Sequence, residues 1–515
     1  MALATAVSLD GEHLTIDDVW SVALEGARAE VSADGRAKMR AARDLVERVA
    51  AETSGEHTYG INTGFGRFVE RTIPPNLSGE LQVRLLRSHA CGVGEPYPDE
   101  IVRAAMLLRA NTLAKGYSGA RVETVELLVE CLNRGVLPLV PSRGSVGASG
   151  DLAPLAHLAL PLVGEGWARI DGTTVSGADA LAQAGLEPVA LEAKEGLSLI
   201  NGTQFMSAVG SLALVRARRL AKTADIACAL SVEALQGSRA SFAPAIHALR
   251  PLPGQHASAE NLVRLLEGSA IIEAHRWCAK VQDAYSLRCA PQVHGASRDL
   301  LEYVERTVAV EVNAATDNPL VLVDEGRLVS NGNFHGQPLA FALDALAMAV
   351  SELASISERR VERLTNPSLS DGLPAFLTAD GGLNSGFMIP QYVAASLVSE
   401  NKALAHPASV DSIPTSAGQE DHVSMGNAAA LKAWQVLANA ESALAIELLG
   451  AAQGIEFLAP LEPGAGGRAA HRFVRRLSET LVEDRPLAPD IERVAAAIRS
   501  GDLVAAVEDE VGELR

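Results

Sequence analysis

Residues 338–364 read PLAFALDALAMAVSELASISERRVERL, and this stretch carries the pattern that predicts the fold class. Its large apolar residues recur in steps of four and three, which places them on one face of a long helix: Leu339, Leu343, Leu346, Val350 and Leu353. A helix of this length with one apolar face is typical of a helical bundle. Further helices are predicted over 101–113, 122–133, 210–236 and 428–449, with a last one over 490–499.

Short strands are predicted in only three places, each a hairpin around a two-residue turn ending in glycine. The hairpins span residues 7–14, 167–175 and 320–329, and a helix is expected from about Asp17. The sequence therefore predicts a mainly α protein, a long up-down helical bundle with a smaller N-terminal region that contains the short strands. We expect the N-terminal region to span residues 1–225 and the bundle with the C-terminal helices to span 226–515.

Composition limits the partners and the compartment. The chain is 48% hydrophobic and its formal net charge is −19, which argues against nucleic acid or an anionic membrane as a partner. Five scattered cysteines without C-x-x-C spacing argue against a disulfide framework or a zinc site. No signal peptide or membrane span is predicted. The expectation is a cytoplasmic protein that captures any anionic substrate with a few local cations.

Residues 144–152 read GSVGASGDL, a glycine-rich loop around one serine. A serine-hydrolase elbow needs G-x-S-x-G and a P-loop needs a lysine after its last glycine, and neither pattern fits. One interpretation is a flexible turn ahead of a helix capped by Asp151. In the other, the nitrogen of Gly150 attacks the carbonyl of Ala148, and loss of two waters leaves an electrophilic methylidene at Ser149. Small residues at 148 and 150 permit that close approach, and the helix N-terminus would favour electron flow into the ring.

The stretch 144–157, GSVGASGDLAPLAH, resembles the signature of the ammonia-lyase and aminomutase family that carries a methylidene-imidazolone group. The resemblance extends through several ordered motifs, from Tyr59 to Pro463. It implies the ammonia-lyase/fumarase-like fold and a homotetramer whose active sites are shared between subunits. It also implies that Ala148, Ser149 and Gly150 form the group autocatalytically, with 2,3-didehydroalanine at residue 149 and with no metal or diffusible cofactor.

Two further motifs contribute residues that would otherwise be unremarkable. Tyr59, in TYGINTGFG at 58–66, reads by itself as a half-buried loop anchor. The matching tyrosine of the family lies on a lid loop and is a candidate for the base that removes the β-proton. Asn201, in KEGLSLINGTQ at 194–204, reads by itself as a turn residue. The matching asparagine hydrogen-bonds the ring oxygen, which takes up charge during the reaction.

The stretch 282–292, QDAYSLRCAPQ, places Tyr285 and Arg288 three residues apart, on one face if the segment is helical. Arg288 could be a buried structural arginine or a bidentate clamp for an amino-acid carboxylate. The resemblance implies that Tyr285 lies beside the electrophile and that Arg288 and Gln282 contact the substrate. It also implies that Phe334, in NGNFHGQP at 331–338, lines the pocket.

Two residues bear on which amino acid is the substrate. His89 could be a satisfied core histidine, but the resemblance places it against the substrate ring. Glu420, in QEDHVSM at 419–425, could be part of an acidic first helical turn. Histidine-specific members resemble this stretch, and a carboxylate can pair with an imidazole N–H, whereas benzene offers it no donor. The expected reaction is therefore L-histidine to trans-urocanate and ammonia.

Some residues depart from that pattern. Gly418 stands where many histidine lyases have asparagine, and residues 335–338 and 390–392 look closer to tyrosine-acting relatives. A tyrosine or phenylalanine ammonia-lyase, or a 2,3-aminomutase, is thus the alternative on the same scaffold. A catalytically inactive helical scaffold protein is a more remote one.

Overall fold

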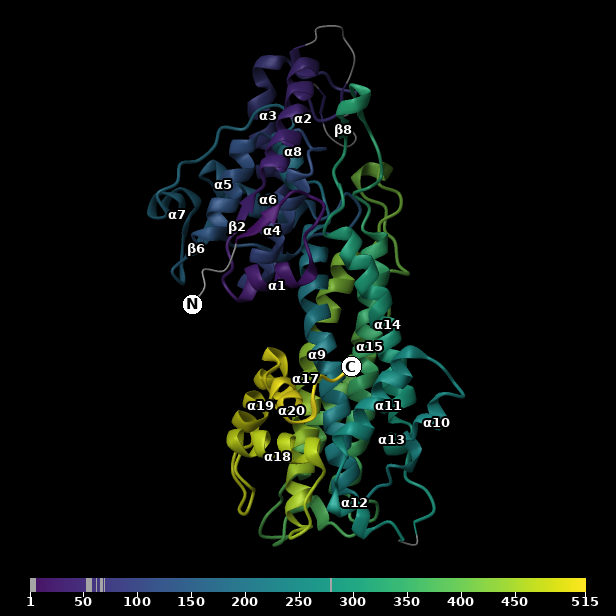
Figure 1. Ribbon diagram of the computed structural model, residues 1–515. Helices are drawn as coiled ribbons and strands as arrows, with labels where there is room; N and C mark the ends of the chain where they lie inside the picture. The colour runs from purple at the N-terminus through teal and green to yellow at the C-terminus, as the bar shows by residue number, and fades with distance from the viewer. Residues whose placement is uncertain (1–5, 52–57, 62, 65–67, 69, 278–279) are drawn as a thin grey trace. The chain divides into compact units, whose positions relative to one another are not determined.

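The computed structural model describes residues 6–51, 58–61, 63–64, 68, 70–277 and 280–515 (Figure 1). It divides into two compact units. Unit 1 comprises Met1–Val215, Glu305–Asp344 and Pro407–Leu431, and unit 2 comprises Arg216–Val304, Ala345–His406 and Lys432–Arg515. The predicted mainly α fold is confirmed. The division at 225/226 stays a prediction, because compact units built from separate segments do not test where one continuous domain ends.

Unit 1 combines short helices with small sheets. Its helices are α1 (Ile16–Leu24), α2 (Ala33–Ala51), α3 (Ser78–His89), α4 (Asp99–Ala114), α5 (Val122–Asn133), α6 (Leu152–Ala159), α7 (Gly177–Gln183) and α8 (Glu195–Ile200). The helix α4 is buried along most of its length, and α1, α2 and α5 pack on it. The helices α3, α6 and α8 pack on one another, which brings the end of α3, the loop before α6 and the end of α8 into one neighbourhood.

The strands of unit 1 confirm two of the three predicted hairpins. The strands are β1 (Val7–Leu9), β2 (Ala29–Val31), β3 (Val93–Pro96), β4 (Leu137–Pro138), β5 (Pro141–Arg143), β6 (Trp167–Ile170), β7 (Thr173–Ser176), β8 (Leu320–Leu322) and β9 (Arg327–Val329). The pairs β6–β7 and β8–β9 are antiparallel hairpins, as predicted. Asp171 and Gly172 have φ values of 47° and 75°, the left-handed conformations that a tight two-residue turn requires.

The predicted hairpin over residues 7–14 is wrong. The strand β1 pairs in parallel with β2, with Val7 opposite Ala29. The turn signal itself is real, because the Asp10 carboxylate accepts hydrogen bonds from the backbone of Glu12 and His13. That turn leads forward into α1, whose N-terminus is capped by Thr15, rather than back along β1.

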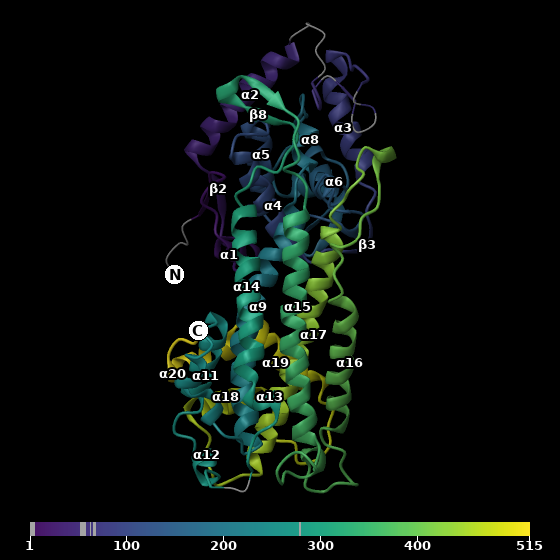
Figure 2. The same cartoon turned by 90° about the vertical axis from the view of Figure 1, so that its right-hand side faces the viewer.

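Unit 2 is built from helices. It contains α10 (Pro244–His247), α11 (Pro253–Leu265), α12 (Ala270–Ala274), α13 (Tyr285–Arg288), α16 (Met388–Leu404), α18 (Ala465–Leu477), α19 (Ala488–Ser500) and α20 (Asp502–Val511). Four long helices contribute residues to both units: α9 (Gln204–Ala234), α14 (Ala290–Glu311), α15 (Gln337–Thr365) and α17 (Gly426–Glu456). Figure 2 shows these four helices running alongside one another within unit 2.

Apolar packing and buried charges hold these helices together. The five residues of the predicted stripe on α15 are all 0% exposed, which confirms that face as core. Among buried charges, Arg360 of α15 pairs with Glu447 of α17, and Ser231 of α9 donates to the same carboxylate. On the other side, His294 of α14 contacts Asp225 of α9 at 2.7 Å. These contacts fix the register of the four helices in unit 2.

Two further points concern the helices. The helix α19 confirms the prediction over 490–499, but it is not the last one, because Gly501, at φ 90°, turns the chain into α20. Among the described residues, α15 is the one helix long and apolar enough to cross a membrane. Of its most apolar window, 72% is buried inside the molecule, which is typical of a core helix.

Candidate active site

The loop 144–151 connects β5 to α6, and two of its glycines adopt left-handed backbone conformations. Gly147 has φ 68° and Gly150 has φ 72°. A Cβ atom on Gly150 would lie 2.1 Å from the carbonyl oxygen of Gly202, so the two backbones touch directly. Ala148, between them, is 3% exposed. Only small residues fit here, as the cyclisation hypothesis requires.

Three segments that are distant in sequence hold this loop through its backbone. The N–H of Met425 donates to the oxygen of Val146 at 2.8 Å. The N–H of Gly336 donates to the oxygen of Gly147 at 3.1 Å, and the N–H of Asp151 donates to the oxygen of Gly202 at 2.7 Å. The loop is therefore a fixed structure rather than a free glycine linker.

One interpretation of the sequence expected Asp151 to cap α6, but its side chain does not do so. It occupies the N-cap position, but its carboxylate accepts hydrogen bonds from the backbone of Phe205 and Met206, at 3.0 Å each. The N–H groups in the first turn of a helix have no acceptor within that helix, so the Asp151 carboxylate caps α9 instead of α6. Burial raises its pKa to about 6, while the hydrogen bonds, including one from Ser145, oppose that rise.

Ser149 is contacted through both its side chain and its carbonyl group. Its hydroxyl donates to Oε1 of Glu420 at 2.8 Å, and its backbone oxygen accepts from Nδ2 of Asn201 at 2.9 Å. The second oxygen of Glu420 accepts from the hydroxyl of Thr415 at 2.6 Å. The structure thus brings two other predicted site residues, Asn201 and Glu420, into contact with Ser149. The Asn201 amide polarises the carbonyl group, and Glu420 presents a carboxylate to the side chain.

His89 is the last residue of α3, and its Nδ1 lies 2.9 Å from the carbonyl oxygen of Leu85. Because a carbonyl can only accept, Nδ1 carries the proton and Nε2 of the neutral ring is an acceptor. Burial lowers the pKa of His89, against the opposing effects of the Leu85 carbonyl and the charge of Glu420. His89 therefore lies within electrostatic reach of Glu420 and tends to be neutral.

Tyr59 and Phe334 also belong to unit 1. Tyr59 lies in a turn in which the N–H of Ile61 donates to the oxygen of Thr58. In the same turn, a Cβ on Gly60 would lie 2.6 Å from Leu197 of α8, the helix that ends at Asn201. Residues 62, 65 and 66 of that motif lie outside the described residues. Half-buried Phe334 precedes by two residues the Gly336 N–H that holds Gly147.

The other three predicted residues belong to unit 2, so the structure does not bring them into the unit that holds Ser149. Tyr285 and Arg288 lie on the single-turn helix α13, and the guanidinium of Arg288 lies 4.7 Å from the ring centroid of Tyr285. The predicted shared face is therefore confirmed. Tyr285 is 71% exposed and Gln282 is exposed, whereas Arg288 is half-buried and donates to the oxygen of Asp283.

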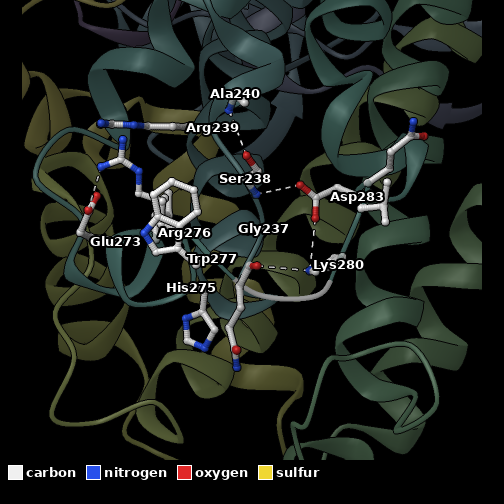
Figure 3. Close-up of a pocket in the computed structure, with 14 residues that line it drawn as sticks. Gly237, Ser238, Arg239, Ala240, Glu273, His275, Arg276, Trp277, Lys280 and Asp283 are labelled. Carbon is white, nitrogen blue, oxygen red and sulfur yellow. Dashed lines mark hydrogen bonds and ion pairs between the residues drawn. The ribbon is translucent and has the colours of Figure 1, made fainter.

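Gln282 lines a pocket of about 430 Å3 in unit 2 (Figure 3). Lys280 donates to the carbonyl oxygens of Leu235 and Gln236 at the end of α9, and it also contacts Asp283. Figure 3 shows Asp283 between Lys280 and Ser238. The Asp283 carboxylate accepts a hydrogen bond from the backbone N–H of Ser238 at 2.7 Å. The Lys280 ammonium is thus engaged with the carbonyl oxygens after α9 and with the Asp283 carboxylate.

Sequence reasoning missed two side chains that support the site. Thr415, which orients Glu420, carries no local signal, because the two residues meet through an isolated bridge in an irregular loop. Arg109 donates to the backbone oxygen of Asn201 at 2.8 Å. Its signal was a charge within the apolar run IVRAAMLLRANTLA at 101–114. Among the described residues, no group of three His, Cys, Asp or Glu side chains could hold a metal ion.

Comparison with known proteins finds matches over nearly the whole sequence. The sequence matches the aromatic amino acid lyase family over residues 14–476. It is 57% identical over 506 residues to the histidine ammonia-lyase of Gloeobacter violaceus, covering 98% of each chain.

Two solved structures are similar over nearly the whole chain. The histidine ammonia-lyase from Trypanosoma cruzi has a TM-score of 0.91 and 48% identity, covering 98% of this chain and 96% of the other. The tyrosine aminomutase from Streptomyces globisporus has a TM-score of 0.93 and 40% identity, covering 99% of this chain and 100% of the other.

Proposed function

The chain belongs to the aromatic amino acid lyase family, and from that premise we propose that it acts as a histidine ammonia-lyase. Such a carbon–nitrogen lyase converts L-histidine to trans-urocanate and ammonia without oxidation, a step of histidine degradation. The observation that carries the choice of substrate is the carboxylate of Glu420, 2.8 Å from the hydroxyl of Ser149. It places an acceptor for an imidazole N–H beside the reacting centre.

We further propose that Ala148, Ser149 and Gly150 mature into a methylidene-imidazolone. The residues fit that group, since Gly150 takes a left-handed conformation in a place where no side chain fits and Ala148 is small and buried. Once formed, the group would supply an electrophilic carbon at residue 149 without a diffusible cofactor. The remaining chemistry belongs to the side chains around it.

Asn201 is proposed to stabilise developing negative charge. Its amide already donates to the backbone oxygen of Ser149, which is the oxygen that the ring would retain. A donor held in place before the reaction is the arrangement that favours charge on that oxygen. Tyr59, on the turn that packs against α8, is the proposed base for the β-proton.

Glu420 and His89 are proposed to recognise the imidazole ring. Glu420 accepts hydrogen bonds, and Nε2 of neutral His89 is also an acceptor. A ring that presents N–H groups satisfies such acceptors, whereas a benzene ring would leave a carboxylate unpaired. Phe334 is proposed to line the same pocket.

Tyr285, Arg288 and Gln282 are proposed to complete the active site of another subunit in a homotetramer. The exposure of Tyr285 and Gln282 in the single chain supports this, because an exposed tyrosine can be covered by a partner. Arg288 would hold the substrate carboxylate, the local cation that a chain with net charge −19 needs. We propose the cytoplasm as the compartment.

A substrate panel tests this function. Purified protein is offered L-histidine, L-tyrosine and L-phenylalanine separately, while unsaturated acids are followed by absorbance and β-amino acids by chromatography. We expect urocanate and ammonia in equal amounts from histidine and little turnover of the other two. Turnover of tyrosine without urocanate would establish the alternative that the similarity to tyrosine aminomutase favours. No turnover of any of the three would support the scaffold alternative.

A further inference from the structure

A fully buried arginine lies behind the turn that contacts Ser149. Arg109 belongs to α4 and is 0% exposed. Its Nη1 donates to the backbone oxygen of Asn201 and to Oε1 of Gln204, each at 2.8 Å. A single guanidinium nitrogen therefore fixes both ends of the turn 201–204, which connects α8 to α9.

Arg103, on the same helix, is an arginine with a structural role. Arg103 uses Nε, Nη1 and Nη2 to donate to the backbone carbonyls of Val22, Ala23 and Leu132. By contrast, Nε and Nη2 of Arg109 have no hydrogen-bond partner among the described residues. Burying a charged group with unmet donors costs free energy. A contribution to stability alone therefore does not explain why an arginine is buried at position 109.

The charge of Arg109 is balanced within a small buried cluster. Burial lowers its pKa to about 10, while nearby Asp317 raises it, so the group stays a cation at neutral pH. Asp317 also forms a buried ion pair with Lys194 at 2.8 Å. Lys194 precedes α8 and Asn201 ends it, so the cluster holds both ends of that helix.

The opposite side of the turn faces the Ser149 loop. Asn201 donates to the oxygen of Ser149, and Gly202 accepts from the N–H of Asp151. A Cβ on Gly202 would lie 2.4 Å from Nη1 of Arg109. The guanidinium, the turn and the loop thus lie in direct contact, with no room for a side chain at residue 202.

We propose that Arg109 is a positioning residue that acts through Asn201, holding the Asn201 amide against the oxygen of Ser149. This inference rests on the proposed function, in which that oxygen gathers negative charge. Loss of the guanidinium should slow the loss of two waters from residues 148–150 and lower kcat. It should leave KM nearly unchanged, because Arg109 touches none of the proposed substrate-binding residues in the contacts described.

The test compares Arg109→Lys with Arg103→Lys, a matched change on the same helix. Intact mass follows maturation after expression, kcat and KM are measured per mature chain, and thermal unfolding reports stability. Removing an oxyanion donor typically lowers kcat by about 100-fold. Lysine keeps the charge, but its side chain is one bond shorter, so its ammonium does not reach the position of Nη1. We expect about a tenfold lower kcat and slower maturation for Arg109→Lys. Arg103→Lys should keep wild-type values for both, even if it lowers the melting temperature.

Arg109→Met extends the series. We expect its kcat to fall about 100-fold, because no donor from residue 109 remains to hold the turn that carries Asn201. If that variant does not fold, the lysine pair decides. Wild-type maturation and kcat in Arg109→Lys would overturn the inference, and so would equal losses in Arg103→Lys, since both would then be structural. A wild-type chain that loses no water and makes no urocanate would instead overturn the proposed function.

Discussion

Replacing Glu420 with glutamine tests how the protein recognises histidine. The substitution keeps the shape of the side chain and removes its charge. In the encoded chain the carboxylate accepts from Ser149 on one oxygen and from Thr415 on the other. Maturation would remove the Ser149 hydroxyl and leave Oε1 for the substrate. In the matured protein, Glu420→Gln therefore removes one hydrogen bond between the substrate and a charged group.

That loss sets the expected magnitude. A hydrogen bond to a charged group contributes about 1.5–3 kcal/mol, and about 1.4 kcal/mol corresponds to a factor of ten. We expect kcat/KM for histidine to fall about 10- to 150-fold, with the lower end favoured because Glu420 is only half-buried. The fold should persist, because the glutamine oxygen can still accept from Thr415.

The assay measures urocanate formation across histidine concentrations for the wild type, Glu420→Gln and a control. Glu192→Gln is that control, since it removes a carboxylate from ion pairs with Arg43 and Arg121 in the same unit. Thermal unfolding and intact mass show whether each variant folds and matures. If matured Glu420→Gln keeps kcat/KM for histidine within twofold of the wild type, Glu420 does not recognise the imidazole.

Two other substitutions probe the loop and the helical bundle. Gly150→Ala should block the two-water mass loss, because its Cβ would lie 2.1 Å from the Gly202 oxygen, whereas Gly185→Ala, with a similar φ of 67° and no atom nearer than 3.8 Å, should mature normally. Maturation of Gly150→Ala at the wild-type rate would refute the steric argument. For Asp225, burial acts to raise the pKa, but Arg298 and the hydrogen bond from His294 lower it to about 2. The stability from ionised Asp225 is thus present above pH 3.8 and lost as the pH falls through 2. Urea unfolding should show the stability difference between the wild type and Asp225→Asn shrinking by about 1 kcal/mol from pH 6 to pH 3. A difference independent of pH would contradict the assigned ionisation.

The long helices could be predicted because their apolar steps repeat over several turns. The helix over 122–133 is found with the predicted bounds, and the stripe on α15 is core. Pairing partners could not be predicted in the same way. The turn at Asp10 and Gly11 was visible, yet β1 pairs with residues 29–31, and no local pattern specifies that choice.

At the site, the residue types could be predicted from the sequence, but their contacts could not. The motif predicted the types of residue that the reaction needs, but Ser149 and Glu420 are 271 residues apart and meet only in the folded chain. Asp151 was expected to cap the helix that follows it, and its carboxylate instead reaches α9. Arg109 shows a signal that sequence reasoning can use, since a charge in an apolar helical run must have buried partners.

Intact-mass spectrometry shows whether residues 148–150 become the electrophile. We predict that the purified wild-type chain is lighter than its encoded sequence by two water molecules, and that the deficit maps to the peptide containing Ser149. Ser149→Ala should fold, lack the full two-water deficit and lose most activity. An active wild-type chain of unmodified mass would show that the reaction does not use an electrophile formed from these residues.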